Sequence, residues 1–291
     1  MTKPRSQLKP VATWSFEPWF KNSRWLRTEL MLACCVASIT SVAQYMGRPS
    51  IYCDSLTRDV LGELDLDCAL LPVYDRVYQR DGVDPRWWMY PKLLTYQAQT
   101  EPYFHFDLDF VIKDTWPAWV WDSEVGFQNF EELETLTKFY ITGPDEGSMI
   151  LPDIFRRWRL TAVVPPNLGY VYQRDMAFNK LYAGTAIDAV LANGDRFPEL
   201  KYPKEANCVL EQQLLALLLR ENKTPCRAFL RDQRDHVNRH FHHYIGAWKN
   251  QPLAAQHLEP LVNDRIRALA RELDQQRLDR THTDIGGQYP T

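Results

Sequence analysis

Hydrophobic and polar positions along the N-terminal part of the chain predict short strands separated by helices. Apolar runs of strand length alternate with longer apolar segments of helix length, and turn-forming residues such as Gly47 and Pro49 lie between them. Either Ser55 or Thr57 is expected to cap a helix that ends near Leu64. The predicted strands are 11–16, 50–53, 69–73, 103–106, 125–128 and 162–164, and the predicted helices are 30–44, 55–64, 90–99, 178–193, 209–221 and 259–280.

This order of elements predicts an α/β fold. Strands that alternate with helices along a chain favour a mainly parallel, Rossmann-like sheet with helices on both faces. The amphipathic segment 259–280 is expected to pack on that sheet as a C-terminal helix, followed by a loose tail at 281–291. No repeat or low-complexity linker divides the sequence, so we expect a single domain over 1–291.

Composition and charge narrow the class of protein. With 291 residues and 45% hydrophobic content, the chain is long enough to bury a large core. Its net charge of -3 argues against nucleic-acid binding, which normally needs a basic surface. The apolar run 30–43 is shorter than a bilayer crossing and is expected to be a buried helix, so no transmembrane segment is predicted. Cysteines without disulfide spacing and an N-terminus without a signal-peptide pattern favour the cytoplasm.

Two acidic residues follow the predicted strand 103–106. In parallel sheets ligands bind at the carboxyl ends of strands, so Asp107 and Asp109 are well placed to hold one hard cation between them. Such a cation can neutralise a diphosphate leaving group. The pattern is common, and Asp65-Leu66-Asp67 repeats it. That second triplet follows a helix-like segment, so the triplet that begins at Asp107 is the stronger candidate.

A second candidate segment lies near the C-terminus, at His242-His243-Tyr244-Ile245-Gly246-Ala247-Trp248-Lys249. A histidine there can complete a metal site, Gly246 lets the backbone approach phosphate oxygens, and Lys249 can pair with diphosphate charge. Only His243 lies three residues before Gly246, which favours it over His242 as the ligand. The competing interpretation is a histidine-rich surface helix with a solvated Lys249.

Four motifs, in order, resemble those of GT-A glycosyltransferases, in particular the glycogenin-like retaining enzymes and related bacterial proteins. The resemblance spans most of the chain, from about Thr13 to Lys249. It departs at Glu211, where the family often has aspartate, and in the first strand, which lacks the usual signature around the base. The four motifs are Tyr103-Phe104-His105-Phe106-Asp107-Leu108-Asp109, Pro166-Asn167-Leu168-Gly169-Tyr170, Glu211-Gln212-Gln213 and His243-x-x-Gly246-x-x-Lys249.

The resemblance implies roles for individual residues. It implies a GT-A fold and transfer from a UDP-sugar, with retention, to a saccharide, lipid, protein or small metabolite. The implied metal ligands for Mn²⁺ or Mg²⁺ are Asp107, Asp109 and His243. The implied catalytic residues are Glu211, Gln212 and Lys249. The implied donor-binding residues are Trp14, Ser15, Asp54, Lys92, Asn167, Gly169, Gly246 and Lys249, with the first three beside the base and Asn167 beside the sugar.

Two other functions fit parts of the same sequence. The motifs also suit a module that binds a nucleotide sugar without turning it over. A zinc hydrolase would use His236, His240, His242 and His243, although no His-Glu-x-x-His order accompanies them. The tryptophans Trp87, Trp88, Trp116, Trp119 and Trp121 fit either a sugar-stacking cleft or ordinary packing in a core or lid.

Overall fold

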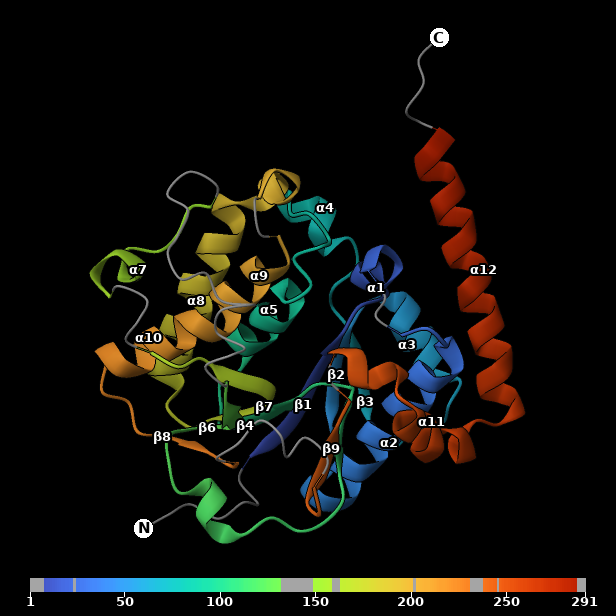
Figure 1. The fold of residues 1–291 in the computed structure, drawn as a ribbon, viewed down its shortest axis with the longest axis horizontal. Coiled ribbons are helices and arrows are strands. Elements are labelled where there is room, and N and C mark those ends of the chain that lie inside the picture. The colour runs from blue at the N-terminus through green and yellow to red at the C-terminus, as the bar shows by residue number, and fades with distance from the viewer. Residues whose placement is uncertain are drawn as a thin grey trace.

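The computed structural model confirms the mixed α/β architecture with a mostly parallel sheet (Figure 1). It describes residues 8–22, 25–131, 149–158, 163–200, 203–230, 238–244 and 246–286. Within these ranges the main sheet has the strand order β3-β2-β1-β4-β7-β6-β8, and β5 and β9 form a separate pair. The strands are β1 Lys9–Trp14, β2 Ser50–Cys53, β3 Ala69–Pro72, β4 Tyr103–Phe106, β5 Phe110–Ile112, β6 Val125–Phe130, β7 Pro166–Gln173, β8 Cys226–Ala228 and β9 Phe241–His243.

One strand of the main sheet, β7, runs opposite to the others. Strands β1, β2, β3 and β4 pair in parallel, whereas β7 runs antiparallel to both β4 and β6. The carboxyl end of β4 therefore lies beside the beginning of β7, and Phe106 pairs with Tyr170. At this edge the candidate metal ligand Asp107 lies beside Gly169, a candidate donor-binding residue.

Helices cover both faces of the sheet. Helices α5, α8 and α10 gather on one side in Figure 1 and cover one face of the sheet. Helix α2 packs on the other face, beneath α11 and α12. The α-helices are α1 Phe16–Asn22, α2 Thr28–Met46, α3 Ser55–Gly62, α4 Val77–Asp81, α5 Tyr90–Ala98, α7 Ile154–Arg157, α8 Met176–Ala192, α9 Pro203–Cys208, α10 Leu214–Glu221, α11 Pro252–Leu258 and α12 Asp264–Gly286. Shorter helical turns are η2 Ala118–Trp121, η4 Gly194–Glu199, η5 Val209–Gln213, η7 Gly246–Asn250 and η8 Glu259–Leu261.

Side-chain alternation along β1 and β4 divides the core into two layers. Val11 and Tyr103 point into the layer beneath α5 and α8, whereas Ala12 and Phe104 point into the layer beneath α2. This is the period-two pattern expected of strands that are buried on both faces. The central strands are therefore covered on both faces, and the candidate site residues lie at the carboxyl edge of the sheet.

Helix α2 is longer than the apolar run that predicted it. It has 19 residues, with a mean hydropathy of 1.3 over its most apolar 18-residue window, and among the described helices it is the one long and apolar enough to cross a membrane. In the structure it packs against β5, α11 and α12, and its cysteines and Ile39 are fully buried. The packing of both sides of this helix accounts for its apolar composition.

Several predicted boundaries were wrong for identifiable reasons. The cap of α3 is Asp54, whose Oδ1 accepts from the Thr57 amide at 2.7 Å, and not Ser55 or Thr57. Of the strand predicted at 162–164, residue 162 lies outside the described residues and 163–164 are not in a strand. Strand β7 begins instead at Pro166, a first position of a strand that proline tolerates. Helix α12 begins at Asp264 because Asn263 Oδ1 accepts from the Ile266 amide at 3.0 Å and so caps it.

Candidate functional site

The turn between β4 and β5 carries the two candidate metal ligands. The Asp107 amide donates to the Gly169 carbonyl at 2.9 Å, and the Phe110 amide donates to the Asp107 carbonyl at 3.0 Å. From α2, the fully buried Ser38 hydroxyl donates to the Phe110 carbonyl at 2.7 Å. The turn is thus held from β7 and from α2, which fixes both aspartates at the edge of the sheet.

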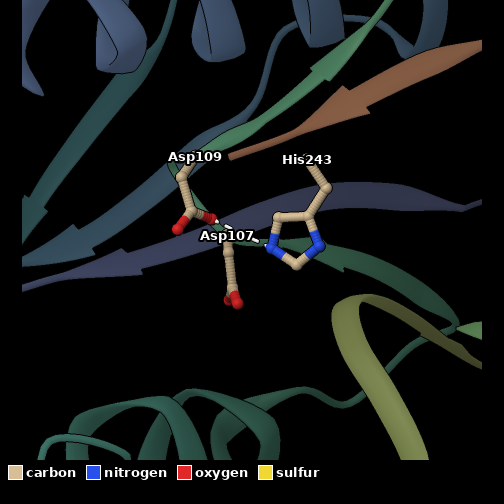
Figure 2. A group of neighbouring side chains, drawn as sticks. All are labelled: Asp107, Asp109 and His243. Atoms are coloured by element: carbon tan, nitrogen blue, oxygen red, sulfur yellow. Dashed lines mark ion pairs between the residues drawn. The ribbon is translucent and has the colours of Figure 1, made fainter. Parts of the chain in front are cut away.

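His243 joins these aspartates from the far end of the chain. Strand β9 pairs with β5 so that His243 lies opposite Phe110, one residue beyond Asp109. Figure 2 shows the imidazole beside the Asp109 carboxylate, and His243 Nε2 lies 3.4 Å from Asp109 Oδ1. One ligand atom from each of Asp107, Asp109 and His243 lies within 4.8 Å of the others.

This cluster has the donor set of a hard divalent cation. Two carboxylates and one imidazole supply oxygen and nitrogen ligands, which suit Mn²⁺ or Mg²⁺ better than a soft metal. The carboxyl groups of Asp107 and Asp109 keep 32% and 17% of their exposure, so the cluster is open on one side. The residues present therefore fit a cation that also contacts a ligand.

The neighbouring His242 does not belong to this cluster. Because adjacent residues of a strand face opposite ways, its ring lies on the other side of β9. There it meets the Lys113 ammonium at 2.8 Å and stacks on His257 with ring centres 4.6 Å apart. Burial lowers the pKa of His242 to about 4, and Lys113 and His257 contribute to this shift. The structure therefore brings His243, and not His242, to the two aspartates.

Lys249 lies over the second aspartate. Its Nζ is 2.8 Å from Asp109 Oδ2 and 5.5 Å from the centre of the Trp25 ring. Gly246, which begins η7, has φ of 51°, a left-handed value that glycine adopts without strain. Burial alone raises the pKa of Asp109, but Lys249 and His243 outweigh it and hold that pKa far below its ordinary value. Asp109 is therefore ionised at neutral pH.

Lys92 makes the corresponding contact with the first aspartate. Helix α5 begins at the carboxyl edge of the sheet, so a side chain of its first turn reaches the end of β4. The buried Lys92 Nζ lies 2.8 Å from Asp107 Oδ1 and 2.7 Å from Glu211 Oε1, and it donates to the Leu168 carbonyl at 3.0 Å. Burial lowers the pKa of Lys92, but the two carboxylates outweigh it and raise that pKa above its ordinary value.

Glu211 and Gln212 differ in their access to the site. Glu211 is fully buried on the π-helical turn η5, whereas Gln212 is half-buried. Burial raises the pKa of both Glu211 and Asp107, and Lys92 opposes the rise in each case. The predicted pair under the sugar thus divides into an enclosed carboxylate and a more accessible amide.

Asn167 and Gly169 lie at the beginning of β7, beside the same edge. The Asn167 side chain is 1% exposed, donates to Glu131 Oε1 at 3.0 Å and accepts from the Gly169 amide at 3.0 Å. A Cβ on Gly169 would lie 2.4 Å from both His243 Cε1 and Gln128 Oε1. The structure therefore gives Gly169 a second role, since only glycine leaves room for the His243 ring. The contact of Asn167 with a sugar stays a prediction.

The residues predicted beside the base gather at the ends of β1 and β2. Trp14 pairs in register with Cys53, and the Ser15 hydroxyl donates to Asp54 Oδ2 at 2.7 Å. Asp54 also accepts from the Phe16 amide at 2.9 Å, in addition to capping α3. These contacts fix the two strand ends together, and a role in base recognition stays a prediction.

The other sequence candidates are not assembled into sites. Among the described residues, the group formed by Asp107, Asp109 and His243 is the one set of three or more histidine, cysteine or acidic side chains with converging ligand atoms. Of the zinc candidates, His236 lies outside the described residues, and His240 Nε2 accepts from Arg239 at 2.9 Å. Asp67, from the repeated acidic triplet, is largely exposed and pairs with Arg48 at 3.3 Å.

The tryptophans mostly pack the interior. Trp87 is fully buried, and Trp116 and Trp121 are each 5% exposed and stack on one another. Trp119 is 43% exposed and stacks on Phe229. Packing in the core therefore explains most of the aromatic residues that also fit a sugar-stacking cleft.

Comparison with family models assigns the chain to a protein family. Residues 13–279 match the model of a family of unknown function, DUF6734. The chain belongs to this family. The matched range includes every candidate site residue, from Trp14 to Lys249.

Comparisons with characterised proteins add less. No curated protein matches this DUF6734 chain. Among solved structures, mouse xyloside xylosyltransferase 1 in its apo form is similar over 81% of this chain and 96% of that chain, at 11% identity and a TM-score of 0.42. At this level of similarity, the chemistry of the DUF6734 protein has to be judged from its own residues.

Two supporting residues were missed by the sequence analysis. Ser38 was read only as part of an apolar helix, although its hydroxyl holds the turn that bears Asp107. His105 was read as part of a strand, but its Nε2 lies 3.0 Å from the Thr13 hydroxyl and its Nδ1 lies 4.0 Å from Asp107 Oδ1. Burial, together with Lys92, lowers the pKa of His105 well below its ordinary value. A polar residue inside an apolar run is the signal that marks both.

Proposed function

We propose that this DUF6734 protein is a metal-dependent glycosyltransferase of the GT-A type, which moves a sugar from a nucleotide-sugar donor to an acceptor. The donor is proposed to be UDP-linked, the cation Mn²⁺ or Mg²⁺ and the outcome retention, as the motif resemblance implies. One observation carries the proposal. Two segments that are distant in sequence, one with Asp107 and Asp109 and the other with His243 and Lys249, meet at the carboxyl edge of the sheet.

The cluster supports this proposal through its charge and its openness. Asp107, Asp109 and His243 would hold the cation, which would supply positive charge to the donor diphosphate as the sugar-phosphate bond breaks. Lys249 adds an ammonium 2.8 Å from the Asp109 carboxylate, at the place where a diphosphate would contact the cation. Gly246 begins the turn that bears Lys249 and leaves its backbone open to close approach by phosphate oxygens.

Other residues are proposed to orient the donor. The half-buried Gln212 can donate hydrogen bonds to sugar hydroxyls. Trp14, Ser15 and Asp54 lie at the ends of β1 and β2, the same sheet edge, where a nucleoside attached to the diphosphate would extend. The acceptor would be a saccharide, lipid, protein or small metabolite that enters from the open side.

The test of this proposal compares the two acidic triplets of the chain. Hydrolysis of, and transfer from, nucleotide sugars are measured with and without Mn²⁺ for wild type, Asp109→Asn and Asp67→Asn. The expected result is Mn²⁺-dependent turnover that Asp109→Asn reduces by about 10²-fold or more, since it removes a metal ligand and a charge. Asp67→Asn is the matched control, because Asp67 is exposed and paired with Arg48.

Two outcomes would contradict the proposal. Turnover that is equal in the Asp109 variant and wild type would remove the metal site from the reaction. Tight donor binding without hydrolysis or transfer, over a panel of acceptors, would establish a binding module instead. A thermal-shift screen of nucleotide sugars with Mn²⁺ selects the donor to use, because a ligand that binds the folded state raises its melting temperature.

A further inference from the structure

The side chains of Lys92, Asp107 and Glu211 form a buried charged triad behind the candidate metal site. Lys92 Nζ lies between the two carboxylates, 2.8 Å from Asp107 Oδ1 and 2.7 Å from Glu211 Oε1. Lys92 also donates to the Leu168 carbonyl at 3.0 Å, so three oxygens, two of them on carboxylates, surround the ammonium. Lys92 is therefore fully committed to these partners.

Glu211 has no surface with which to contact a sugar. Its side chain has zero exposure, whereas the Asp107 carboxyl keeps 32% and faces the open side of the cluster. The turn η5 that carries Glu211 is π-helical and is anchored by the Tyr182 hydroxyl, which donates to the Glu211 carbonyl at 2.6 Å. Such a turn inserts an extra residue into a helix and is often found at functional sites. Here it directs the carboxylate inward, toward Lys92.

The charge of the triad explains why an enclosed carboxylate is present. An ammonium that had Asp107 as its one carboxylate partner would neutralise that ligand and compete with a cation for its oxygens. Glu211 supplies a second carboxylate, so the triad keeps a net negative charge while Lys92 still fixes the position of Asp107. The arrangement holds a metal ligand rigidly without cancelling its charge.

We propose that Glu211 is a positioning residue that acts on the metal site through Lys92 and makes no contact with the donor sugar. This inference rests on the proposed function, because it assigns a role within the same site. It predicts that affinity for the metal alone, without any donor, depends on Glu211. A glutamate that contacts the sugar would leave that affinity unchanged.

In the experiment, the purified protein is titrated with Mn²⁺ alone, and the concentration of free Mn²⁺ is measured by electron paramagnetic resonance. Glu211→Gln is expected to weaken Mn²⁺ binding by about tenfold or more, because it removes one negative charge from a low-dielectric site. The double variant Lys92→Met with Glu211→Gln restores the net charge of the triad and is expected to recover most of that loss. Glu101→Gln, at an exposed residue, is the matched control and is expected to bind as wild type does.

The outcomes separate this inference from the proposed function. If wild type binds Mn²⁺ and Asp109→Asn abolishes binding, but Glu211→Gln binds as wild type does, the inference is wrong and the metal site stands. If wild type does not bind Mn²⁺, both are wrong. Should Glu211→Gln not fold, Glu211→Asp keeps the charge and is expected to stay within about threefold of wild type. A larger loss in that variant, with the double variant no better, would assign Glu211 to packing alone.

Discussion

The α-carbon of Gly169 lies against the imidazole of His243, so closely that a single added methyl group would overlap the ring. This contact joins β7 to β9 at the point where the metal candidates meet. It also shows that the position of the histidine is set by backbone as much as by its own hydrogen bonds. Substitution of Gly169, which has no side chain of its own, should therefore affect the metal site.

Gly169→Ala is expected to weaken Mn²⁺ binding by about tenfold and to lower the free energy of unfolding by about 1–3 kcal/mol, because the new Cβ must displace His243 or Gln128. Mn²⁺ titration and urea denaturation measure the two effects. Gly184→Ala is the control. That glycine lies within α8, its added Cβ has no neighbour nearer than 3.9 Å, and alanine there should stabilise the helix. Equal Mn²⁺ affinity in Gly169→Ala and wild type would show that His243 tolerates the displacement.

Lys249 is expected to have opposite effects on two ligands. Its ammonium occupies Asp109 Oδ2 at 2.8 Å and so competes with a cation, yet it is also placed to pair with a diphosphate. Lys249→Gln should therefore strengthen binding of Mn²⁺ alone by a few-fold and weaken binding of UDP with Mn²⁺ by about tenfold. Calorimetry of both ligands tests the crossover, with Lys180→Gln on the exposed surface of α8 as control. If Lys249→Gln weakened both the binding of Mn²⁺ alone and the binding of UDP with Mn²⁺, competition between Lys249 and the cation would be refuted.

His242 makes stability depend on pH. Because burial, Lys113 and His257 lower its pKa to about 4, the unfolded chain binds more protons than the folded protein between that value and the ordinary pKa near 6.5. The free energy of unfolding should thus fall as pH drops through this interval, by at most about 3 kcal/mol from this group. Urea denaturation at several pH values measures the slope. His242→Gln should reduce it, and an unchanged slope in that variant would assign the dependence to other groups.

The tryptophans near β6 should differ in their contributions to stability according to how deeply each is buried. Trp116 is 5% exposed and stacks between Phe229 and Trp121, so Trp116→Ala is expected to cost about 3–5 kcal/mol of stability. Trp119→Ala, at a residue that is 43% exposed, should cost about 1 kcal/mol or less. Chemical denaturation compares them. If Trp119→Ala were instead to impair acceptor use with stability unchanged, the sugar-stacking interpretation would hold for that residue.

The sequence predicted the elements that have strong local signals. The strand Tyr103–Phe106 was predicted with its observed bounds, because a run of three aromatic residues and His105 ends at the first of two acidic residues. Strand β9 gave no such signal, since three residues show no alternation and its pairing with β5 is long-range. Motif order still placed His243 and Lys249 in the site. Their meeting with Asp109 confirms that part of the reasoning.

The sequence did not reveal how the charges are shared. Lys92, Asp107 and Glu211 are distant from one another along the chain, and their contact depends on the crossing of α5 and η5 over the end of β4. A residue list gives a lysine and two acids. Only the packing shows that one acid is enclosed and the other open, and therefore that they have different tasks.

The order of synthesis adds a constraint on this site. Asp109 is made early, with β4 and β5, whereas its partners His243 and Lys249 are made only after the main sheet is complete. In a growing chain Asp107 can already pair with Lys92, whereas Asp109 is without its counter-charges until the late segment arrives and β9 pairs with β5. The three candidate metal ligands should therefore come together as one of the last events of folding.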